Sequence, residues 1–444
     1  MLLTPSEAKA VTDRLLMRSK ADHCIVRLNG GERTNLRFAR GNATTNGDQS
    51  YLRVTVESHF GQRAGAASVS GLDGQALDAA ISRSEEIARS APENGELLPP
   101  AGPQTYPGGA GYDAPTAAVR AERLAAVSKP IIDEAASRAV DVAGYCMARR
   151  GFDAMATSAG QFAHDAQTGA EFTVTARNRA GTWSGWAGRS DTRFDLLDTV
   201  RLGRRAIDKA AYTAPAVRLE PGRYTVILEP SAVCDLVAWM LWRMNARDAD
   251  EGRSVFSRRG GGNRLGEKLF QDGVTIFTDP GDPVAPERVF GDEGLPQRRT
   301  VWVQDGILRN LIHSRFWAQE KGRGPVARPG SFVMAGGTTT VDDMIRATQR
   351  GVLVTRFWYM RLLDAQNLVV TGLTRDGNFL IENGRIAAPA LNFRFNESPV
   401  AVLANVLAIG PSERTRSGEN EDSVVSAPPL LVKDFNFSSA SEAI

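Results

Sequence analysis

Cysteine and histidine are scarce in this chain, and their scarcity limits its chemistry. The 444 residues include three cysteines and four histidines. Cys24, Cys146 and Cys234 lie far apart and form no paired motif, so no disulfide framework is expected and a reducing, cytoplasmic compartment fits best. Cys234 lies in an apolar run and is most simply a small core residue.

The histidines offer no local metal site. His23, His59, His164 and His313 are too widely spaced for any two to chelate an ion from one helix or short strand. A zinc enzyme needs about three protein ligands and an open position for water. The pair His164-Asp165 is the best candidate for a cation site, but a surface turn explains it better. His313 is most simply a hydrogen-bonded sheet residue.

The chain also lacks an excess of charge and any long apolar run. Its 53 Lys and Arg balance 51 Asp and Glu, which gives a net charge of +2. This balance argues against a general nucleic-acid binder. No segment reaches the roughly 20 apolar residues of a membrane helix, and the N-terminus lacks the apolar core of a signal peptide. We therefore expect no membrane association.

The sequence pattern changes near residue 219. Residues 1–215 alternate helical and strand periodicities, which predicts a composite α/β N-terminal domain, with a Pro- and Gly-rich loop or linker at about 91–115. Residues 219–444 are mostly strand-like, which predicts a β-rich C-terminal domain with hairpins and a few helices. The fold class is therefore α+β.

Individual elements can be placed from periodicity and turn signals. Asp305-Gly306 and Asn383-Gly384 are strong two-residue hairpin signals, because such turns need positive φ at both residues. The Gly-Gly pair at 30–31 suggests a further hairpin within residues 24–41. Helices are expected over residues 4–18, 75–90, 117–139, 196–211 and 231–247.

Several motifs after residue 220 occur in a specific order. They are PGRYTVILEPSA (221–232), EGRSVFS (251–257), DGVTIFTDP (272–280), LVVTGLTRDGNFLIENGRI (368–386) and SPVAVLANVLAIGP (398–411). In order and spacing they resemble the TldD/PmbA (TldE) family of zinc metallopeptidases, and the similarity covers most of residues 30–437. The resemblance implies a two-domain fold. It also implies TldD–TldE pairs, in which one subunit holds zinc and cuts unfolded peptides, while the other lacks the zinc motif.

The zinc motif of that family is missing here. Catalytic members carry His-Glu, three residues, and a second His on the helix after the Pro-Gly-Arg-Tyr strand. The matching positions hold Ala238, Trp239 and Arg243. The family's third ligand is a Cys in a C-terminal loop, and the corresponding tail 412–429 contains none. The resemblance thus implies a TldE/PmbA-like subunit with no catalytic residues and no metal of its own, which acts with a zinc-bearing TldD-like partner on unfolded peptides.

Two other functions remain open. The chain could be an independently active peptidase with a rearranged site around His164, His313 or the acids Asp248, Asp250 and Glu251. It could also be a homo-oligomeric peptide-binding protein without catalysis. The sequence is therefore compatible with a homodimer and with a heterodimer. The acids are more simply explained by ion pairs with Arg243 or Arg247 at the end of the predicted helix. Trp239 and Trp242 are expected in the core or at a subunit interface.

Candidate substrate contacts come from two loops. One is rich in glycine and arginine, and its guanidinium groups suit a peptide carboxylate or an acidic partner surface. The other combines a Gly-Gly break with a Thr run, as a substrate-lining strand and loop would, and an extended peptide can add to a sheet edge there. The candidates are Arg258, Arg259, Arg264, Gly336, Gly337 and Thr338.

Overall fold

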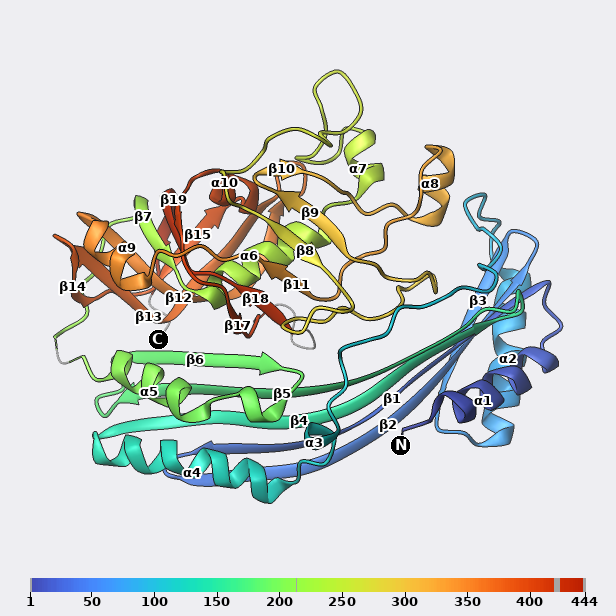
Figure 1. Ribbon diagram of the computed structural model, residues 1–444, viewed down its shortest axis with the longest axis horizontal. Coiled ribbons are helices and arrows are strands. Elements are labelled where there is room, and N and C mark those ends of the chain that lie inside the picture. The colour runs from blue at the N-terminus through green and yellow to red at the C-terminus, as the bar shows by residue number, and fades with distance from the viewer. Residues whose placement is uncertain (1, 213, 419–423, 442–444) are drawn as a thin grey trace.

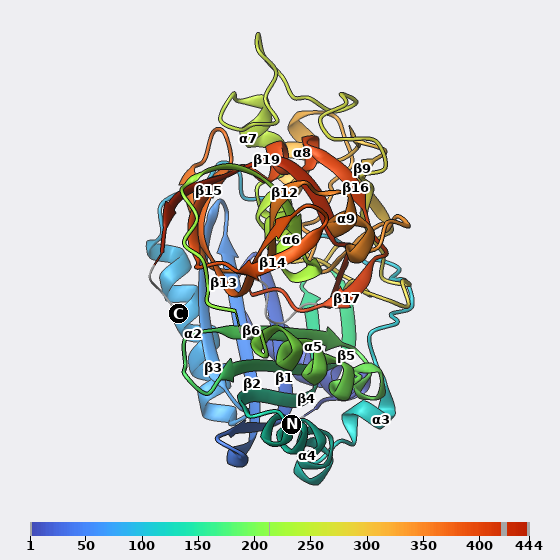
Figure 2. The same cartoon turned by 90° about the vertical axis from the view of Figure 1, so that its left-hand side faces the viewer.

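The computed structural model describes residues 2–212, 214–418 and 424–441. Its N-terminal half is built on one six-stranded antiparallel sheet, and its C-terminal half lies over one face of that sheet (Figures 1 and 2). The architecture is α+β, as predicted. Each helix in these ranges is too short or too polar to cross a lipid bilayer.

The N-terminal sheet has the order β3-β2-β1-β4-β5-β6. Its central strands are long and curve across the molecule (Figure 1). The strands are β1 (His23–Ala39), β2 (Asn42–Phe60), β3 (Arg63–Ser70), β4 (Val140–Thr157), β5 (Phe162–Asn178) and β6 (Ser184–Asp191).

The hairpin predicted at Gly30-Gly31 is wrong. Strand β1 passes straight through both glycines, which pair with Phe152 and Gly151 of β4. The chain instead turns at Arg40 and Gly41, which have φ values of 52° and 77°. A Gly-Gly pair permits a turn but does not require one, and here strands on both sides hold the backbone extended.

Helices cover one face of this sheet. Helix α1 (Pro5–Arg18) packs on β1 and β4, α2 (Gly74–Ser90) on β2 and β3, α4 (Ala121–Ser137) on β4, and α5 (Thr199–Ala210) on β5 and β6. Apolar side chains from alternate strand positions meet these helices and form the core of this half. The other face of the sheet is turned toward the C-terminal half (Figure 2).

Residues 91–113 form a long loop that touches both halves. It runs from α2 to the short helix α3 (Ala114–Ala117) along the side of the molecule (Figure 1). Within the N-terminal half, the Asn94 amide donates to the Gln62 carbonyl at 2.8 Å. Toward the C-terminal half, the Tyr106 hydroxyl donates to the Gly294 carbonyl at 2.8 Å. Of the two alternatives for this segment, a linker or a long surface loop, the structure shows the loop.

The C-terminal half contains two sheets. The seven-stranded sheet closes into a ring through β12, β7, β19, β15 and β13, because β12 also pairs with β13. Its strands are β7 (Gly222–Leu228), β12 (Arg350–Asp364), β13 (Val369–Glu382), β14 (Arg385–Pro389), β15 (Phe393–Glu397), β16 (Val406–Ile409) and β19 (Leu430–Ala440). The six-stranded sheet comprises β8 (Ile276–Thr278), β9 (Thr300–Gln304), β10 (Ile307–Leu308), β11 (Phe332–Met334), β17 (Glu413–Thr415) and β18 (Val425–Ala427).

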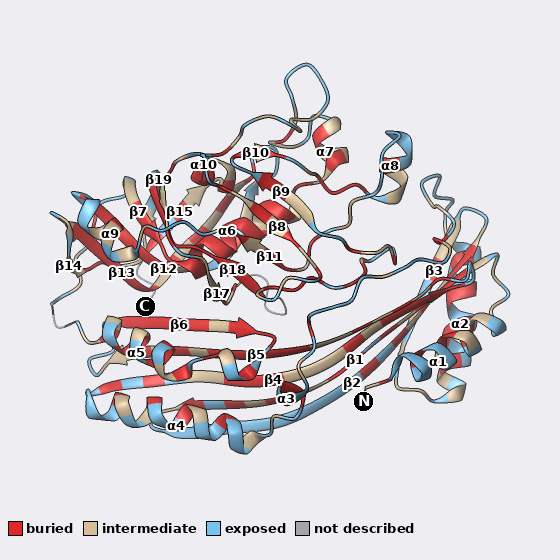
Figure 3. Cartoon of the chain, in the orientation of Figure 1, coloured by how far each residue is buried: buried red, intermediate tan, exposed pale blue. Residues whose placement is uncertain are grey.

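Helix α6 (Pro230–Trp242) lies in the core of this half. It packs on β12 of one sheet and on β17 and β18 of the other, and it is buried along most of its length (Figure 3). Its Cys234 is fully buried, as predicted. The remaining helices here are α7 (Ala246–Asp250), α8 (Arg315–Glu320), α9 (Val341–Ala347) and α10 (Pro399–Ala404).

The two hairpin signals singled out in the sequence are confirmed. Asp305 and Gly306 join β9 to β10 with φ values of 47° and 79°, and Asn383 and Gly384 join β13 to β14 with 51° and 75°. A third Asp-Gly pair, Asp376-Gly377, lies inside β13 and makes no turn, although its φ values are also positive.

Candidate functional site

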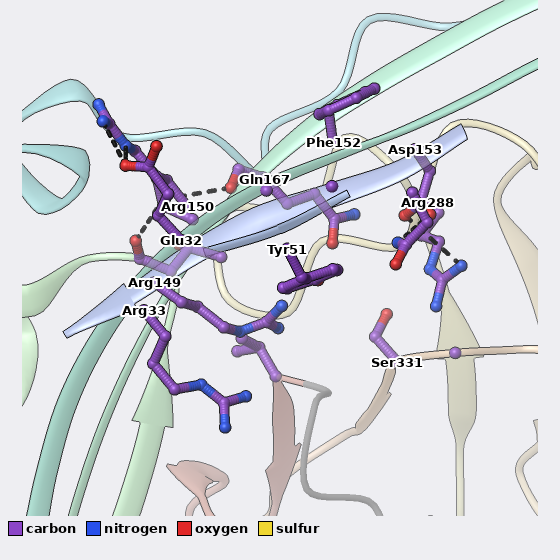
Figure 4. A pocket seen from close by; sticks show the side chains of 18 of the residues that line it. Glu32, Arg33, Tyr51, Arg149, Arg150, Phe152, Asp153, Gln167, Arg288 and Ser331 are labelled. Atoms are coloured by element: carbon purple, nitrogen blue, oxygen red, sulfur yellow. Dashed lines mark hydrogen bonds and ion pairs between the residues drawn. The ribbon is translucent and has the colours of Figure 1, made fainter. Parts of the chain in front are cut away.

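A large cleft lies between the uncovered face of the N-terminal sheet and the C-terminal half. Its volume is about 740 Å³. The sheet contributes its floor through β1, β2, β4 and β5. The C-terminal half contributes Trp242, residues 286–288, residues 329–331 and Val424. Figure 4 shows several of these side chains around the cleft.

Strand register arranges the floor in rows. In one row, Gly31 of β1 faces Tyr51 of β2 and Gly151 of β4. Directly opposite partners lie on the same face of a sheet, and so this row carries two positions without side chains. A Cβ at Gly31 would lie 3.0 Å from the Tyr51 hydroxyl oxygen, so the tyrosine lies close over the glycine.

The next row places two arginines side by side. Arg33 of β1 is the direct partner of Arg149 of β4, and Figure 4 shows both extending in the same direction. Gly169 of β5 pairs with Arg149 on its other side. A Cβ at Gly169 would lie 2.6 Å from Arg149 Nε, and hence the guanidinium group lies across the glycine.

The lining of the cleft has a positive charge balance. It contains the arginines 33, 53, 149, 150 and 288 and the carboxylates of Glu32, Asp153 and Glu287. Arg150 Nη2 lies 2.6 Å from Glu32 Oε2, and its hydrogen bond is the main reason that the pKa of Glu32 lies below its usual value. Arg288 Nη1 lies 3.8 Å from Asp153 Oδ2. The arginines thus outnumber the carboxylates.

Two carboxylates between the halves are buried: Glu287 lines the cleft, and Asp165 lies outside its lining. Glu287 accepts hydrogen bonds from the amides of Gly330 at 2.7 Å and Ser331 at 2.9 Å, and burial raises its pKa. Asp165 accepts from the Val289 amide at 3.3 Å and from Gln167 Nε2 at 3.0 Å. Burial raises the pKa of Asp165 to about 6.

The prediction that His164 and Asp165 form a surface turn is wrong. Both lie within β5, paired with Ala154 and Asp153 of β4. Their side chains point to opposite faces, because successive strand residues alternate. His164 Nε2 lies 3.0 Å from the Leu3 carbonyl oxygen on the helix side, and Asp165 faces the C-terminal half.

Helix α6 reaches the cleft at its C-terminal end. Trp242 lines the cleft and packs edge-on against Trp239, with ring centroids 5.6 Å apart. Both tryptophans pack against the core of the C-terminal half, as predicted for a core position. Ala238 is 2% exposed, and Arg243 lies exposed just beyond the helix.

The side chains at 238, 239 and 243 do not fit zinc. Zinc is bound by thiolate, imidazole or carboxylate groups, whereas these positions offer a methyl group, an indole N–H that only donates, and a cation. Within residues 2–212, 214–418 and 424–441, no three His, Cys, Asp or Glu side chains are grouped to hold a metal ion.

The single helix predicted over 231–247 is two helices. Helix α6 ends at Trp242, and α7 restarts at Ala246. The Asn245 side chain caps α7 by accepting from the amides of Arg247 and Asp248. A short polar cap of this kind competes with continuation of the first helix.

The acids of α7 have partners, as expected for structural residues. Glu251 accepts from Arg247 Nε at 2.9 Å, which confirms one of the two predicted pairings. Asp248 lies 2.9 Å from Arg253. Asp250 accepts from Trp317 Nε1 at 2.8 Å and from Asn263 at 2.6 Å.

The C-terminal tail is fastened to α6 beside the cleft. Asp235 of α6 accepts from the Ser417 hydroxyl at 2.7 Å and from the Gly418 amide at 2.8 Å. Residues 419–423, part of the cysteine-free tail, lie outside the described residues. Val424, which follows them, lines the cleft. Both segments on which catalytic family members would carry ligands therefore border this cleft.

The substrate contacts proposed from sequence lie elsewhere in the described structure. Arg258 and Arg264 share Glu267, with Nε–Oε distances of 2.8 and 2.9 Å, and Arg259 is exposed in the same loop. Gly336 and Gly337 let residues 409–412 approach closely, since a Cβ on either would lie within 2.4 Å of that backbone. With Thr338, these residues stay a prediction for a surface away from the cleft.

Comparison with known families assigns the C-terminal half. Residues 221–439 match the family described as the PmbA/TldA metallopeptidase C-terminal domain. The TldD/PmbA family therefore includes this chain. It is a peptidase-like protein of that family.

Curated relatives agree with this assignment. A protein named metalloprotease from Methanothermobacter thermautotrophicus is 26% identical over 248 residues, 51% of this chain and 52% of that protein. Another metalloprotease, from Archaeoglobus fulgidus, is 24% identical over 189 residues, 38% and 43% of the two chains. The match spans about half the length of the first relative and less of the second.

Solved structures share the fold of almost the whole chain. A putative modulator of DNA gyrase from Thermotoga maritima superposes with a TM-score of 0.83 at 17% identity, over 96% of this chain and 99% of that one. TldE from Thermococcus kodakarensis superposes with a TM-score of 0.82 at 17% identity, over 97% and 99%. At such identities the likeness concerns the fold alone.

The main feature that the sequence did not reveal is the arginine pair. Arg33 and Arg149 lie on strands separated by more than a hundred residues of sequence, and only the register of β1 with β4 brings them together. The sequence contains only a weak indication of a site here: glycines precede Arg33 and follow Arg150 on segments that are predicted to be strands.

Proposed function

We propose that this chain is a TldE/PmbA-like subunit that holds no zinc, pairs with a zinc-bearing TldD-like protein, and helps to hold an unfolded peptide while the partner hydrolyses it. The observation that carries the proposal is the combination at helix α6. The helix borders a cleft of about 740 Å³ through Trp242, and its family ligand positions hold Ala238, Trp239 and Arg243. The place for a substrate is kept while the residues for metal chemistry are replaced.

The shape of the cleft supports a peptide as its occupant. Its floor is a sheet face with a row of glycines, and its walls come from loops of the other half. An extended chain can lie on such a floor with backbone hydrogen bonds to the loops. Polar and charged groups dominate the lining, which favours a hydrophilic, unfolded segment over an apolar small molecule.

An independently active peptidase has less support. The His164 ring lies against the Leu3 carbonyl oxygen, and His313 Nδ1 lies 2.8 Å from the Leu311 carbonyl oxygen. The acids of α7 are held by Arg247, Arg253 and Trp317. These groups are accounted for by structural contacts.

Metal analysis of the purified chain tests the proposal. We expect no bound zinc in the chain alone, and one zinc ion per stable heteropair when it is co-purified with its TldD-like partner. Cleavage of an unfolded peptide should require both chains and should stop on addition of a chelator. As a control, the partner with its motif histidines replaced by alanine should still pair but neither bind zinc nor cleave.

Two results would contradict the proposal. Stoichiometric zinc in the chain alone, with chelator-sensitive cleavage, would make it an enzyme in its own right. A stable self-dimer that never associates with the partner in size-exclusion chromatography would favour a homo-oligomeric peptide-binding protein.

A further inference from the structure

The outer face of strand β12 carries exposed apolar side chains. Trp358, Tyr359 and Leu363 are 43%, 62% and 59% exposed. Trp358 is the direct partner of Leu373 in β13, which in turn pairs with Arg394 of β15. Directly opposite partners share a face of the sheet, so these three form one row across it. Apolar patches of this kind on a protein surface mark sites of interaction.

Tyr359 has a backbone conformation that suits glycine better than tyrosine. It lies in a β-bulge, where the register shifts between Trp358 and Arg361, and its φ is 55°. This left-handed conformation is strained for a tyrosine and relaxed for a glycine. Packing within the chain compensates little of the strain, because the ring is mostly exposed. Strained residues gather at functional sites, and the exposed ring therefore points to a contact outside the chain.

Two arginines hold the Trp358 ring in place. Arg356 Cζ lies 5.3 Å from the centre of this ring and 4.9 Å from the centre of the Trp186 ring in β6. Arg375 Cζ lies 4.9 Å from the centre of the Trp358 ring. These cation–π contacts order the indole before a partner binds, which reduces the conformational entropy that binding costs.

This stack of rings and arginines stands on the sheet face that also forms the floor of the cleft. Trp186 of β6 pairs with Thr175 of β5. Thr175 lies on the same face as Gln167, because the two are an even number of residues apart on one strand, and Gln167 lines the cleft. The exposed surface on β12 therefore borders a continuation of the cleft floor.

Positive charge surrounds the apolar centre of this surface. Arg361 donates to a carbonyl oxygen at 2.6 Å and Arg394 to a hydroxyl oxygen at 3.3 Å, and such neutral partners do not compensate the guanidinium charges. Asp364, at the end of β12, accepts from two backbone amides of the turn that follows. A protein surface with carboxylates around an apolar centre would complement this arrangement.

A protein fits this surface better than a nucleic acid does. Bases bind by stacking on open aromatic faces, whereas arginines already lie over the rings of Trp358 and Tyr359. Tryptophan, tyrosine and arginine are also the residues that contribute most to binding energy in protein interfaces.

We propose that the surface formed by Trp358, Tyr359, Arg361, Leu363 and Arg394 docks the zinc-bearing TldD-like partner, through an apolar site on that protein that is ringed by carboxylates. The proposal rests on the pairing proposed above and adds where the partner binds. Docking there would bring the partner to the sheet face that holds the peptide.

The affinity of the full-length chain for the TldD-like protein of the same organism, measured by biolayer interferometry, tests the inference. Tyr359→Gly removes the ring and should weaken pairing about tenfold. It should melt within about 2 °C of the wild type, because the relieved strain offsets the entropy that glycine loses on folding. Leu363→Glu sets a carboxylate against an apolar, acid-ringed site and should weaken pairing at least about tenfold. Leu407→Glu is the matched control, because Leu407 is 55% exposed on β16, which pairs with β19, and should leave the affinity unchanged.

The arginines give a second, independent readout. Raising NaCl from about 50 mM to about 500 mM should weaken pairing of the wild type several-fold, because salt screens exposed charges. Arg361→Gln combined with Arg394→Gln should reduce this salt dependence. Binding of a labelled unfolded peptide to the chain alone, measured by fluorescence anisotropy, should stay unchanged in every variant, because these residues lie outside the lining of the cleft.

The outcomes separate this inference from the proposed function. If Tyr359→Gly and Leu363→Glu pair as tightly as the wild type, the inference fails and the proposed pairing stands. If the wild type does not bind the TldD-like protein at all, the proposed function fails and the inference with it. Unchanged partner affinity in Leu363→Glu, together with lost binding to anionic vesicles or to a single-stranded oligonucleotide, would overturn the inference in favour of a lipid or a nucleic acid.

Discussion

Asp165 illustrates how one buried carboxylate sets a pH dependence. Burial raises its pKa to about 6 from an ordinary value of 3.8. The folded state therefore binds a proton more tightly than the unfolded state between about pH 4 and pH 6. By linkage, the stability contributed by this group falls as the pH rises through that range and is constant above it.

Replacement of Asp165 by Asn should remove this effect. We expect Asp165→Asn to unfold with less dependence on pH between 4 and 6 and to be more stable near pH 7 by roughly 1–3 kcal/mol, since one pKa unit corresponds to about 1.4 kcal/mol. Urea unfolding at several pH values measures both. Asp133→Asn is the control, because Asp133 is 59% exposed on α4. Lower stability of Asp165→Asn at pH 7 would show that the hydrogen bonds of Asp165 outweigh its desolvation.

Local chemistry decided which single residues could be interpreted from sequence. The assignment of Ala238, Trp239 and Arg243 to the family's ligand positions rests on their spacing after the Pro-Gly-Arg-Tyr strand, and it stays a prediction. Cys234 could be placed in the core because its neighbours are apolar. His164 and Asp165 were wrongly predicted to lie in a turn. A His-Asp pair also occurs in a strand when each of the two sheet faces offers its side chain a polar partner, and the sequence does not distinguish the two cases.

At the scale of elements, the glycines of β1 and β4 define the floor of the cleft. A Cβ at Gly151 would lie 3.1 Å from the Gly30 carbonyl oxygen, a contact that a small shift relieves. A larger side chain there would project into the cleft from the centre of the sheet. Gly151 thus matters for the space that it leaves above the sheet.

Filling this space should weaken peptide binding with little loss of stability. We expect Gly151→Val to reduce peptide affinity about tenfold, and to change the free energy of unfolding by less than about 1 kcal/mol, since valine favours strands. Anisotropy and urea unfolding measure the two effects. Ala66→Val, on an exposed position of β3, is the matched control. Unchanged affinity in Gly151→Val would place the peptide elsewhere.

Elements with their own turn or cap signals were predicted well. The hairpins at Asp305-Gly306 and Asn383-Gly384 formed because both residues of each pair adopt positive φ. Thr4 and Glu7 form a capping box at the start of α1. The break between α6 and α7 was not predicted. An Asn cap inside a helical pattern competes with continuation of the helix, and hydrophobic periodicity does not show which of the two is more stable.

At the scale of the whole molecule, buried charges hold the two halves together. Lys209 of α5 donates to Glu229 at 2.6 Å and to Thr355 at 2.8 Å. Burial lowers its pKa to about 8. Arg205 of the same helix lies 2.7 Å from Glu413. The cleft lies between the two halves that these contacts join.

Loss of Lys209 should loosen this junction. We expect Lys209→Met to destabilise the protein by about 3 kcal/mol, because it leaves Glu229 buried with one partner fewer, and to weaken peptide binding as well. Urea unfolding and anisotropy measure these effects. Lys129→Met should change stability by less than about 0.5 kcal/mol, since Lys129 is 73% exposed. A similarly small effect at Lys209 would mean that the junction depends on its other contacts.

The arrangement of the site could not be predicted at this scale. The motif helix and the cysteine-free tail were recognised as segments, but the cleft depends on how the sheet face meets the C-terminal half. That contact is made by pairs such as Arg416 with Glu171, which are separated by most of the chain. Sequence periodicity carries no information about such pairs.

The outer end of strand β2 bears on how the protein behaves at high concentration. Residues 42–51 lie beyond the stretch that pairs with β3 and are exposed throughout (Figure 3), so in the described structure their outer edge has no strand partner. Open strand edges are where sheets of separate molecules join into aggregates. The sequence NATTNGDQSY is polar and contains a glycine and an aspartate, both disfavoured in strands. This composition should let the protein tolerate crowding despite an open sheet edge.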